Sequence, residues 1–138
     1  MKTMLNSILL VDDSEADLFL TSRVIRKAAV TETLVAKHSA QEALDYLSQR
    51  VDEQYPRPAI IFLDINMPRM SGWDFLDAYE QLDPEMKAQI VVCMLTTSQA
   101  QRDREKAAQY QVIGGFTNKP LTQEKLMAII RQHFPEHI

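Results

Sequence analysis

The chain of 138 residues is long enough for one domain with a sizeable apolar core, and its composition, 46% hydrophobic and 25% charged, is ordinary for a globular protein. The formal net charge of -4 argues against nucleic acid or an anionic membrane as the main partner. No apolar run approaches the length of a transmembrane helix or of a secretory signal. The only cysteine, Cys93, has no partner for an internal disulfide, which favours a cytoplasmic protein.

Short apolar segments alternate with helical patterns along the whole chain. The apolar segments predict strands at residues 8–11, 33–37, 59–63, 90–95 and 114–118. Each strand is followed by a predicted helix, and these helices begin at Ser14, Ser39, Gly72, Ser98 and Thr122. Two of the helix starts resemble capping boxes, a variant form at Ser14 with Asp17 and the full form at Ser39 with Glu42.

Apolar spacing within the first two helices predicts which side chains share a face. In the first helix these are Ala16, Leu20, Val24 and Ala28. In the second helix Ala43, Leu44 and Leu47 are expected to face inward. The helix that runs from Ser98 toward Tyr110 has mostly alanines as inward residues, so it is expected to pack weakly.

Five successive strand–helix units predict an α/β fold with helices on both faces of a parallel sheet. The first, third and fourth strands are apolar enough to be central, and the second and fifth are mixed or short, as edge strands tend to be. Right-handed crossovers then favour a five-stranded parallel sheet of order 2-1-3-4-5, the doubly wound, flavodoxin-like, three-layer αβα arrangement. Ligands bind such sheets beyond the carboxyl ends of the strands, where the strand order reverses.

Acidic side chains follow the two strands that flank this reversal. Asp12 and Asp13 end the first strand, and Asp64 ends the third. By themselves, Asp12 and Asp13 are as consistent with a turn that caps the next helix as with a functional site. Together the three carboxylates repel one another unless a cation binds, and Mg²⁺ prefers oxygen ligands of this kind. Asp64 is interpreted as a further metal ligand or as a nucleophile toward phosphorus.

Two other strand ends complete the predicted crevice. Thr96 and Thr97 follow the fourth strand, where a hydroxyl is able to hydrogen-bond a phosphoryl oxygen on Asp64. Lys119 follows the fifth strand, where an ammonium would balance the acids. Each of these residues also has an ordinary structural interpretation, as a turn hydroxyl or a solvated surface lysine.

The motifs strand-DD, "LDINMPRMSG", "MLTTS" and "NKP" lie in the order and spacing of the response regulator receiver domain. The chain resembles the stand-alone, chemotaxis-regulator type of that family over essentially its whole length, which implies a single receiver domain at residues 1–138 with no output domain. The resemblance implies that Asp64 is the phosphoacceptor and that Asp12 and Asp13 form the Mg²⁺ site with it, with the backbone carbonyl of Asn66 as a further metal ligand. It also implies that Thr96 is the switch hydroxyl and Phe116 the aromatic switch. Lys119 would be the phosphate-contacting lysine, joined to Pro120 by a cis peptide bond.

The function implied is that of a phosphoacceptor in a two-component phosphorelay, and not that of an enzyme. Its donor would be a histidine kinase or a histidine phosphotransfer protein. Its output would be protein–protein contact, with a downstream protein or a second copy, through the face formed by the fourth helix, the fifth strand and the last helix. No direct contact with nucleic acid and no membrane insertion are expected. The connection at residues 48–58 is longer than in compact family members and lies away from the crevice.

Three alternatives remain open from the sequence. A receiver-like scaffold would act without phosphorylation. A haloacid-dehalogenase-type phosphatase would also use a strand-end aspartate, but it expects a second aspartate where this chain has Asn66. A flavodoxin-like FMN carrier would need a first loop that attracts phosphate, whereas "DDSEAD" would repel it.

Overall fold

The computed structural model describes residues 4–65, 67, 69–95, 100–110 and 112–137. Its centre is a parallel sheet in the order β2-β1-β3-β4-β5, as predicted. The strands are β1 (Leu5–Val11), β2 (Thr31–Lys37), β3 (Ile60–Asp64), β4 (Ile90–Leu95) and β5 (Ile113–Asn118). The helices are α1 (Glu15–Ala28), α2 (Ala40–Leu47), α3 (Gly72–Glu80), α4 (Ala100–Ala107) and α5 (Gln123–His133), and short 3-10 turns cover Pro84–Met86 and Pro135–His137.

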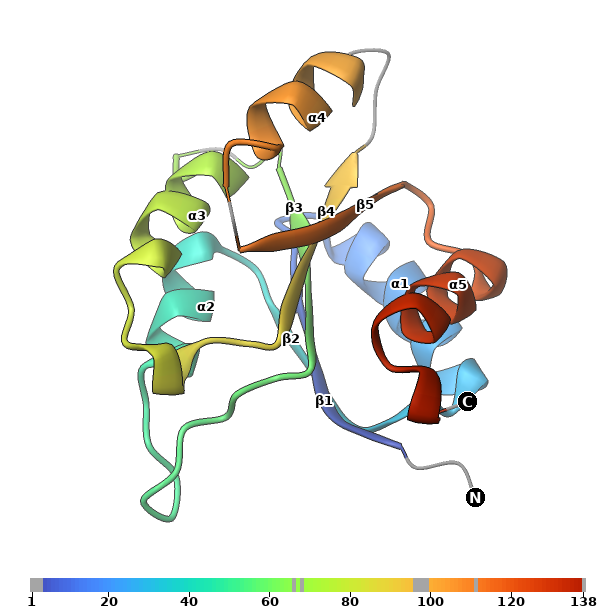
Figure 1. The fold of residues 1–138 in the computed structure, drawn as a ribbon, viewed down its shortest axis with the longest axis horizontal. Coiled ribbons are helices and arrows are strands. Elements are labelled where there is room, and N and C mark those ends of the chain that lie inside the picture. The colour runs from blue at the N-terminus through green and yellow to red at the C-terminus, as the bar shows by residue number, and fades with distance from the viewer. Residues whose placement is uncertain (1–3, 66, 68, 96–99, 111, 138) are drawn as a thin grey trace.

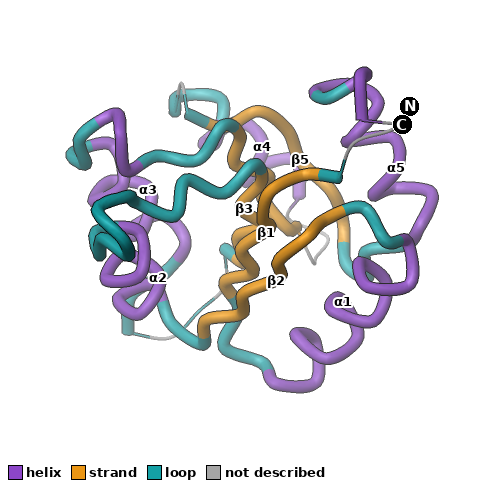
Figure 2. Tube along the Cα trace, turned by 90° about the horizontal axis from the view of Figure 1, so that it is seen from below, coloured by secondary structure: helices purple, strands orange, loops and turns teal. Residues whose placement is uncertain are grey.

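The sheet is covered on both faces because its central strands are apolar on both sides. Ile8 and Leu10 of β1 belong to the core shared with α1 and α5. The alternate residues Leu9 and Val11 belong to the core shared with α2 and α3. Figures 1 and 2 show α1 and α5 on one side of the sheet and α2 and α3 on the other. The fold is therefore the predicted three-layer, doubly wound αβα arrangement.

The buried face of α1 agrees with the predicted one only in part, since Val24 and Ala28 are partly buried and pack against the core shared with α5. Leu18 and Ile25 are buried, whereas Ala16 is exposed and Leu20 has 52% of its surface exposed. Residues 18–20 are all apolar, so the sequence allows more than one inward face, and contact with α5 selects the face with Leu18. In α2 the prediction is confirmed, since Ala43, Leu44 and Leu47 are all buried.

The long connection before β3 forms a small hairpin. Val51 and Gln54 exchange two backbone hydrogen bonds of 2.8 and 3.0 Å. Asp52 and Glu53 between them both have positive φ, 53° and 65°, the backbone form of a tight two-residue turn. Because it leads into the start of β3, it lies at the opposite end of the sheet from Asp64 (Figure 1).

The described helices include none with the length and apolarity needed to span a bilayer.

Candidate functional site

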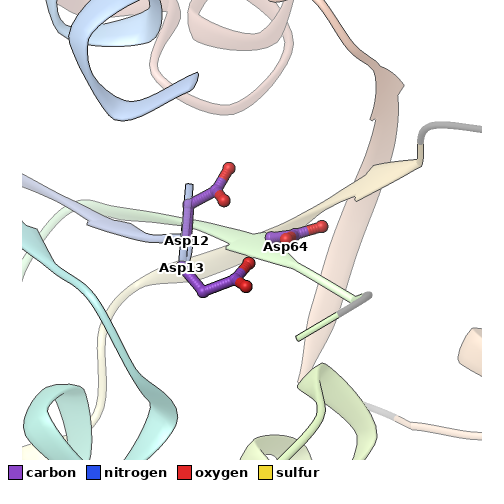
Figure 3. Close-up of side chains that lie close together, drawn as sticks. All are labelled: Asp12, Asp13 and Asp64. Carbon is purple, nitrogen blue, oxygen red and sulfur yellow. The ribbon is translucent and has the colours of Figure 1, made fainter. Parts of the chain in front are cut away.

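Three carboxylates meet at the carboxyl ends of β1 and β3. The register pairs Val11 with Leu63, so that Asp12 and Asp64 lie side by side after the last paired residues. Asp12, Asp13 and Asp64 each present a carboxylate oxygen within 4.8 Å of the others (Figure 3). Asp12 and Asp64 are 7% and 3% exposed, and Asp13 is open to solvent. The predicted convergence of these residues is therefore confirmed.

Lys119 extends into this cluster from the end of β5. Its Nζ lies 2.6 Å from Asp12 Oδ2 and 3.5 Å from Asp64 Oδ1. Burial would lower the pKa of Lys119, but hydrogen bonds to Asp12 and Asp17 and the charge of Asp64 outweigh it and raise the pKa above its usual value. The lysine is therefore a fixed positive charge. The Lys119–Pro120 peptide bond is cis, as expected.

Asp17 is a fourth acidic residue of the site, and the sequence analysis missed it. Its Oδ2 lies 2.9 Å from Lys119 Nζ. The sequence analysis considered Asp17 only as part of a helix cap. A signal was present nonetheless, since Asp17 lies in the first turn of the helix that directly follows Asp12 and Asp13.

The backbone after Asp64 is held by the start of α3. The N–H of Gly72 donates to the carbonyl oxygen of Ile65 at 3.0 Å. A side chain at Gly72 would collide with that backbone, because an ideal Cβ there lies 2.6 Å from Ile65 Cα. Ser71 and Asp74 form a reciprocal capping box that fixes the first turn of the helix. A residue without a side chain is therefore needed at Gly72 to bring α3 against the end of β3.

Several predicted site residues lie outside the described part of the chain or keep an untested role. Asn66, Thr96 and Thr97 are outside the described residues. Phe116 is half-buried and packs against the core on the α2 and α3 side of the sheet. Its role as a switch stays a prediction.

The chemistry of the crevice fits a hard divalent cation. Four carboxylates stand against one ammonium, a formal charge of -3. Oxygen ligands of Mg²⁺ lie about 2.1 Å from the ion and hence roughly 3 to 4 Å from one another. The carboxylate oxygens of Asp12, Asp13 and Asp64, which all lie within 4.8 Å of one another, are close to that spacing. The donor set therefore suits Mg²⁺.

A family model for the response regulator receiver domain matches residues 8–131. The chain belongs to this family. Receiver domains are the signalling phosphoacceptors of two-component systems. The assignment favours the predicted class over the phosphatase and flavin-carrier alternatives.

Individual relatives support the same assignment. Response regulator Rcp1 of Synechocystis sp. is 36% identical over 97 residues, which are 70% of this chain and 65% of that protein, slightly less than two thirds of its length. Protein PilG of Pseudomonas aeruginosa is 29% identical over 135 residues, 93% of this chain and 87% of that protein. The solved structure of a two component response regulator from Cytophaga hutchinsonii has a TM-score of 0.79 at 27% identity and covers 97% of this chain and 100% of that chain. The receiver fold therefore extends over nearly the whole chain.

Proposed function

We propose that Asp64 accepts a phosphoryl group from a phosphohistidine on a histidine kinase or a histidine phosphotransfer protein. The observation that carries this proposal is the place of the Asp64 carboxylate. It is 3% exposed and lies in a crevice where it meets the carboxylates of Asp12 and Asp13 and the ammonium of Lys119. A carboxylate buried among other acids costs stability, so such an arrangement is favoured by function rather than by folding.

The proposed transfer needs only an oxygen nucleophile and a good leaving group. A carboxylate oxygen of Asp64 attacks phosphorus in line with the bond to the donor imidazole. The phosphorus–nitrogen bond breaks, its electron pair returns to the imidazole nitrogen, and a phosphorus–oxygen bond to Asp64 forms. The product adds about one to two negative charges at this end of the sheet.

We propose that Asp12, Asp13 and Asp64 hold Mg²⁺, with the backbone carbonyl of Asn66 as a further ligand. Such an ion supplies positive charge to the phosphoryl oxygens during transfer. The two strand-end aspartates of β1 fix its place relative to Asp64. Asp12 is itself oriented by the Ser14 N–H, which donates to Asp12 Oδ1 at 3.0 Å.

The response to the added charge is assigned to Lys119, Thr96 and Phe116. Lys119 balances the phosphoryl group, the Thr96 hydroxyl hydrogen-bonds to it, and Phe116 changes its packing as β5 adjusts. Of the α4 side chains that the structure describes, only Ala107 is buried, so little apolar contact opposes movement of this helix. Phosphorylation then shifts an existing balance between two states of the α4, β5 and α5 face.

We propose that the protein signals from the cytoplasm by protein–protein contact rather than as an enzyme or a nucleic-acid binder. The net charge of -4 and the single cysteine support this proposal. Phe19 and Leu20 of α1 are 61% and 52% exposed and give a protein donor an apolar surface. The α4, β5 and α5 face is the proposed surface for a downstream protein or a second copy.

Intact-mass measurement after incubation with Mg²⁺ and a small phosphodonor tests the proposal. The native protein is expected to gain one phosphoryl group, and Asp64→Asn is expected to gain none. Asp45→Asn, an exposed aspartate on α2, is the matched control and should be labelled like the native protein. Equal labelling of Asp64→Asn and the native protein would refute the assignment of Asp64. No labelling of the native protein would favour the phosphorylation-independent scaffold.

A further inference from the structure

The Lys119 ammonium has three donors and three carboxylate partners. Its Nζ contacts Asp12 Oδ2 at 2.6 Å, Asp17 Oδ2 at 2.9 Å and Asp64 Oδ1 at 3.5 Å. Two of these partners, Asp12 and Asp64, are also members of the acid cluster that suits a metal ion. Asp17 is not a member of that cluster. Among the described residues, Asp17 is therefore the one ion-pair partner of Lys119 that lies outside the acid cluster.

The position of Asp17 at the start of α1 leaves its carboxylate available for this contact. In α3 the equivalent acid, Asp74, accepts the N–H of Ser71 at 2.9 Å and completes a capping box. In α1 the N–H of Ser14 donates instead to Asp12 Oδ1 at 3.0 Å. The backbone N–H of Asp17 still donates to Ser14 Oγ at 3.2 Å, but its carboxylate turns to Lys119, 102 residues away in the chain. The predicted variant of the capping box is thus only half formed.

We propose that Asp17 is a positioning residue that keeps the Lys119 ammonium in the crevice when a metal ion occupies Asp12 and Asp64. Without metal, all three carboxylates hold the ammonium. With a metal ion bound, Asp12 and Asp64 would direct oxygens to it, and their contacts with Lys119 would weaken. Asp17 then holds Lys119 beside Asp64, where it can meet the incoming phosphoryl oxygens. The phosphoryl step of this inference rests on the proposed function.

The burial of the pair sets the size of the expected effect. The side chain of Lys119 is 15% exposed and that of Asp17 is 40% exposed. A partly hydrated ion pair of this kind contributes less than a buried one, and we expect its loss to change Lys119-dependent rates by about fivefold.

The test compares three variants of the full chain, with and without Mg²⁺. Asp17→Asn removes the charge and keeps the shape of the side chain. Glu15→Gln removes the same charge from the same turn of α1 at a side chain that is 88% exposed, so it is the matched control for helix-terminus charge. Asp17→Glu restores the charge and should restore the behaviour.

The first readout is NMR of the lysine side chains in isotope-labelled protein with the metal alone, with Lys119 assigned from Lys119→Arg. In the native protein and in Glu15→Gln, the Lys119 signal is expected to stay that of an immobilised side chain after Mg²⁺ is added. In Asp17→Asn it is expected to be native-like without Mg²⁺ and to show a mobile side chain with Mg²⁺. A purely structural role for Asp17 would change the signal equally in both conditions.

The second readout is the rate of labelling by a small phosphodonor, expected to be about fivefold lower in Asp17→Asn and near native in the other two variants. An immobilised Lys119 in Asp17→Asn with Mg²⁺ present would overturn the proposal. The proposal would also be overturned if Mg²⁺ made the Lys119 side chain as mobile in Glu15→Gln as in Asp17→Asn. If the native protein is not labelled at all, the proposed function fails, and the metal-only NMR measurement still decides the role of Asp17.

Discussion

Substitution of Gly72 by alanine tests whether the start of α3 positions Asp64. An ideal Cβ at Gly72 lies 2.6 Å from Ile65 Cα and 2.8 Å from the carbonyl oxygen of Asp64. Carbon atoms in contact normally lie about 3.5 to 4.0 Å apart, so α3 or the backbone after Asp64 has to move by roughly 1 Å. Both close atoms belong to the backbone, so rotation of a side chain cannot relieve the collision.

The energetic cost follows from two opposing terms. Overpacking of this kind costs about 1–3 kcal/mol, and the better helix propensity of alanine offsets at most about 1 kcal/mol. We therefore expect the free energy of unfolding to fall by about 1–2 kcal/mol, measured by urea denaturation. Because displacement of a reacting group by roughly 1 Å slows reactions by up to about 100-fold, we also expect labelling to slow by about tenfold or more.

Gly115→Ala in β5 is the matched control. The nearest atom to its added Cβ is His133 Nε2 at 4.0 Å, so the new methyl group makes only an ordinary van der Waals contact. Its stability should stay within about 1 kcal/mol of the native value, and its labelling rate should be native. The reasoning is refuted if Gly72→Ala unfolds at the native urea midpoint and is labelled at the native rate.

Three further predictions concern other parts of the molecule. Burial raises the pKa of Tyr79 to about 12, so the folded state holds this proton more tightly than the unfolded state. The free energy of unfolding should therefore fall between pH 10 and 12, by at most about 1.4 kcal/mol per pH unit. Tyr79→Phe should remove the part of this pH dependence that comes from Tyr79, and denaturation across this pH range measures the difference. Tyr110→Phe removes the 2.8 Å hydrogen bond to Asp77 on α3. We therefore expect amide exchange to become faster in α4 and to stay unchanged in α5. Lys119→Ala should still be labelled on Asp64, but binding of beryllofluoride should no longer change amide exchange in α4 and β5; an undiminished change would remove its proposed role.

The sequence predicted the sheet well because burial on both faces leaves a clear pattern. Central strands such as β3 are buried on both faces and apolar up to Leu63, and this apolar character together with right-handed crossovers gave the predicted order. The convergence of Asp12 and Asp64 followed from that order, since the carboxyl ends of adjacent parallel strands meet.

Features that depend on tertiary contact were not predictable in the same way. The prediction of the inward face of α1 was only partly right, because three consecutive apolar residues fit more than one face until α5 is present. The partner of Asp17 was missed because its capping position explained the residue locally, while Lys119 lies 102 residues further along the chain. The hairpin at Val51–Gln54 uses Asp52 and Glu53 at positive φ, and neither residue has the strong preference for that backbone form that glycine has.

The central claim is that Asp64 is the phosphoacceptor in a crevice that also holds Mg²⁺. A crystal structure of the protein grown with Mg²⁺ and beryllofluoride tests it most directly. The account predicts beryllium bonded to a carboxylate oxygen of Asp64, Mg²⁺ between that group and the carboxylates of Asp12 and Asp13, and the Lys119 ammonium in contact with fluoride. Beryllofluoride bound to another residue, or an Asp64 carboxylate still paired with Lys119 and without metal, would contradict it.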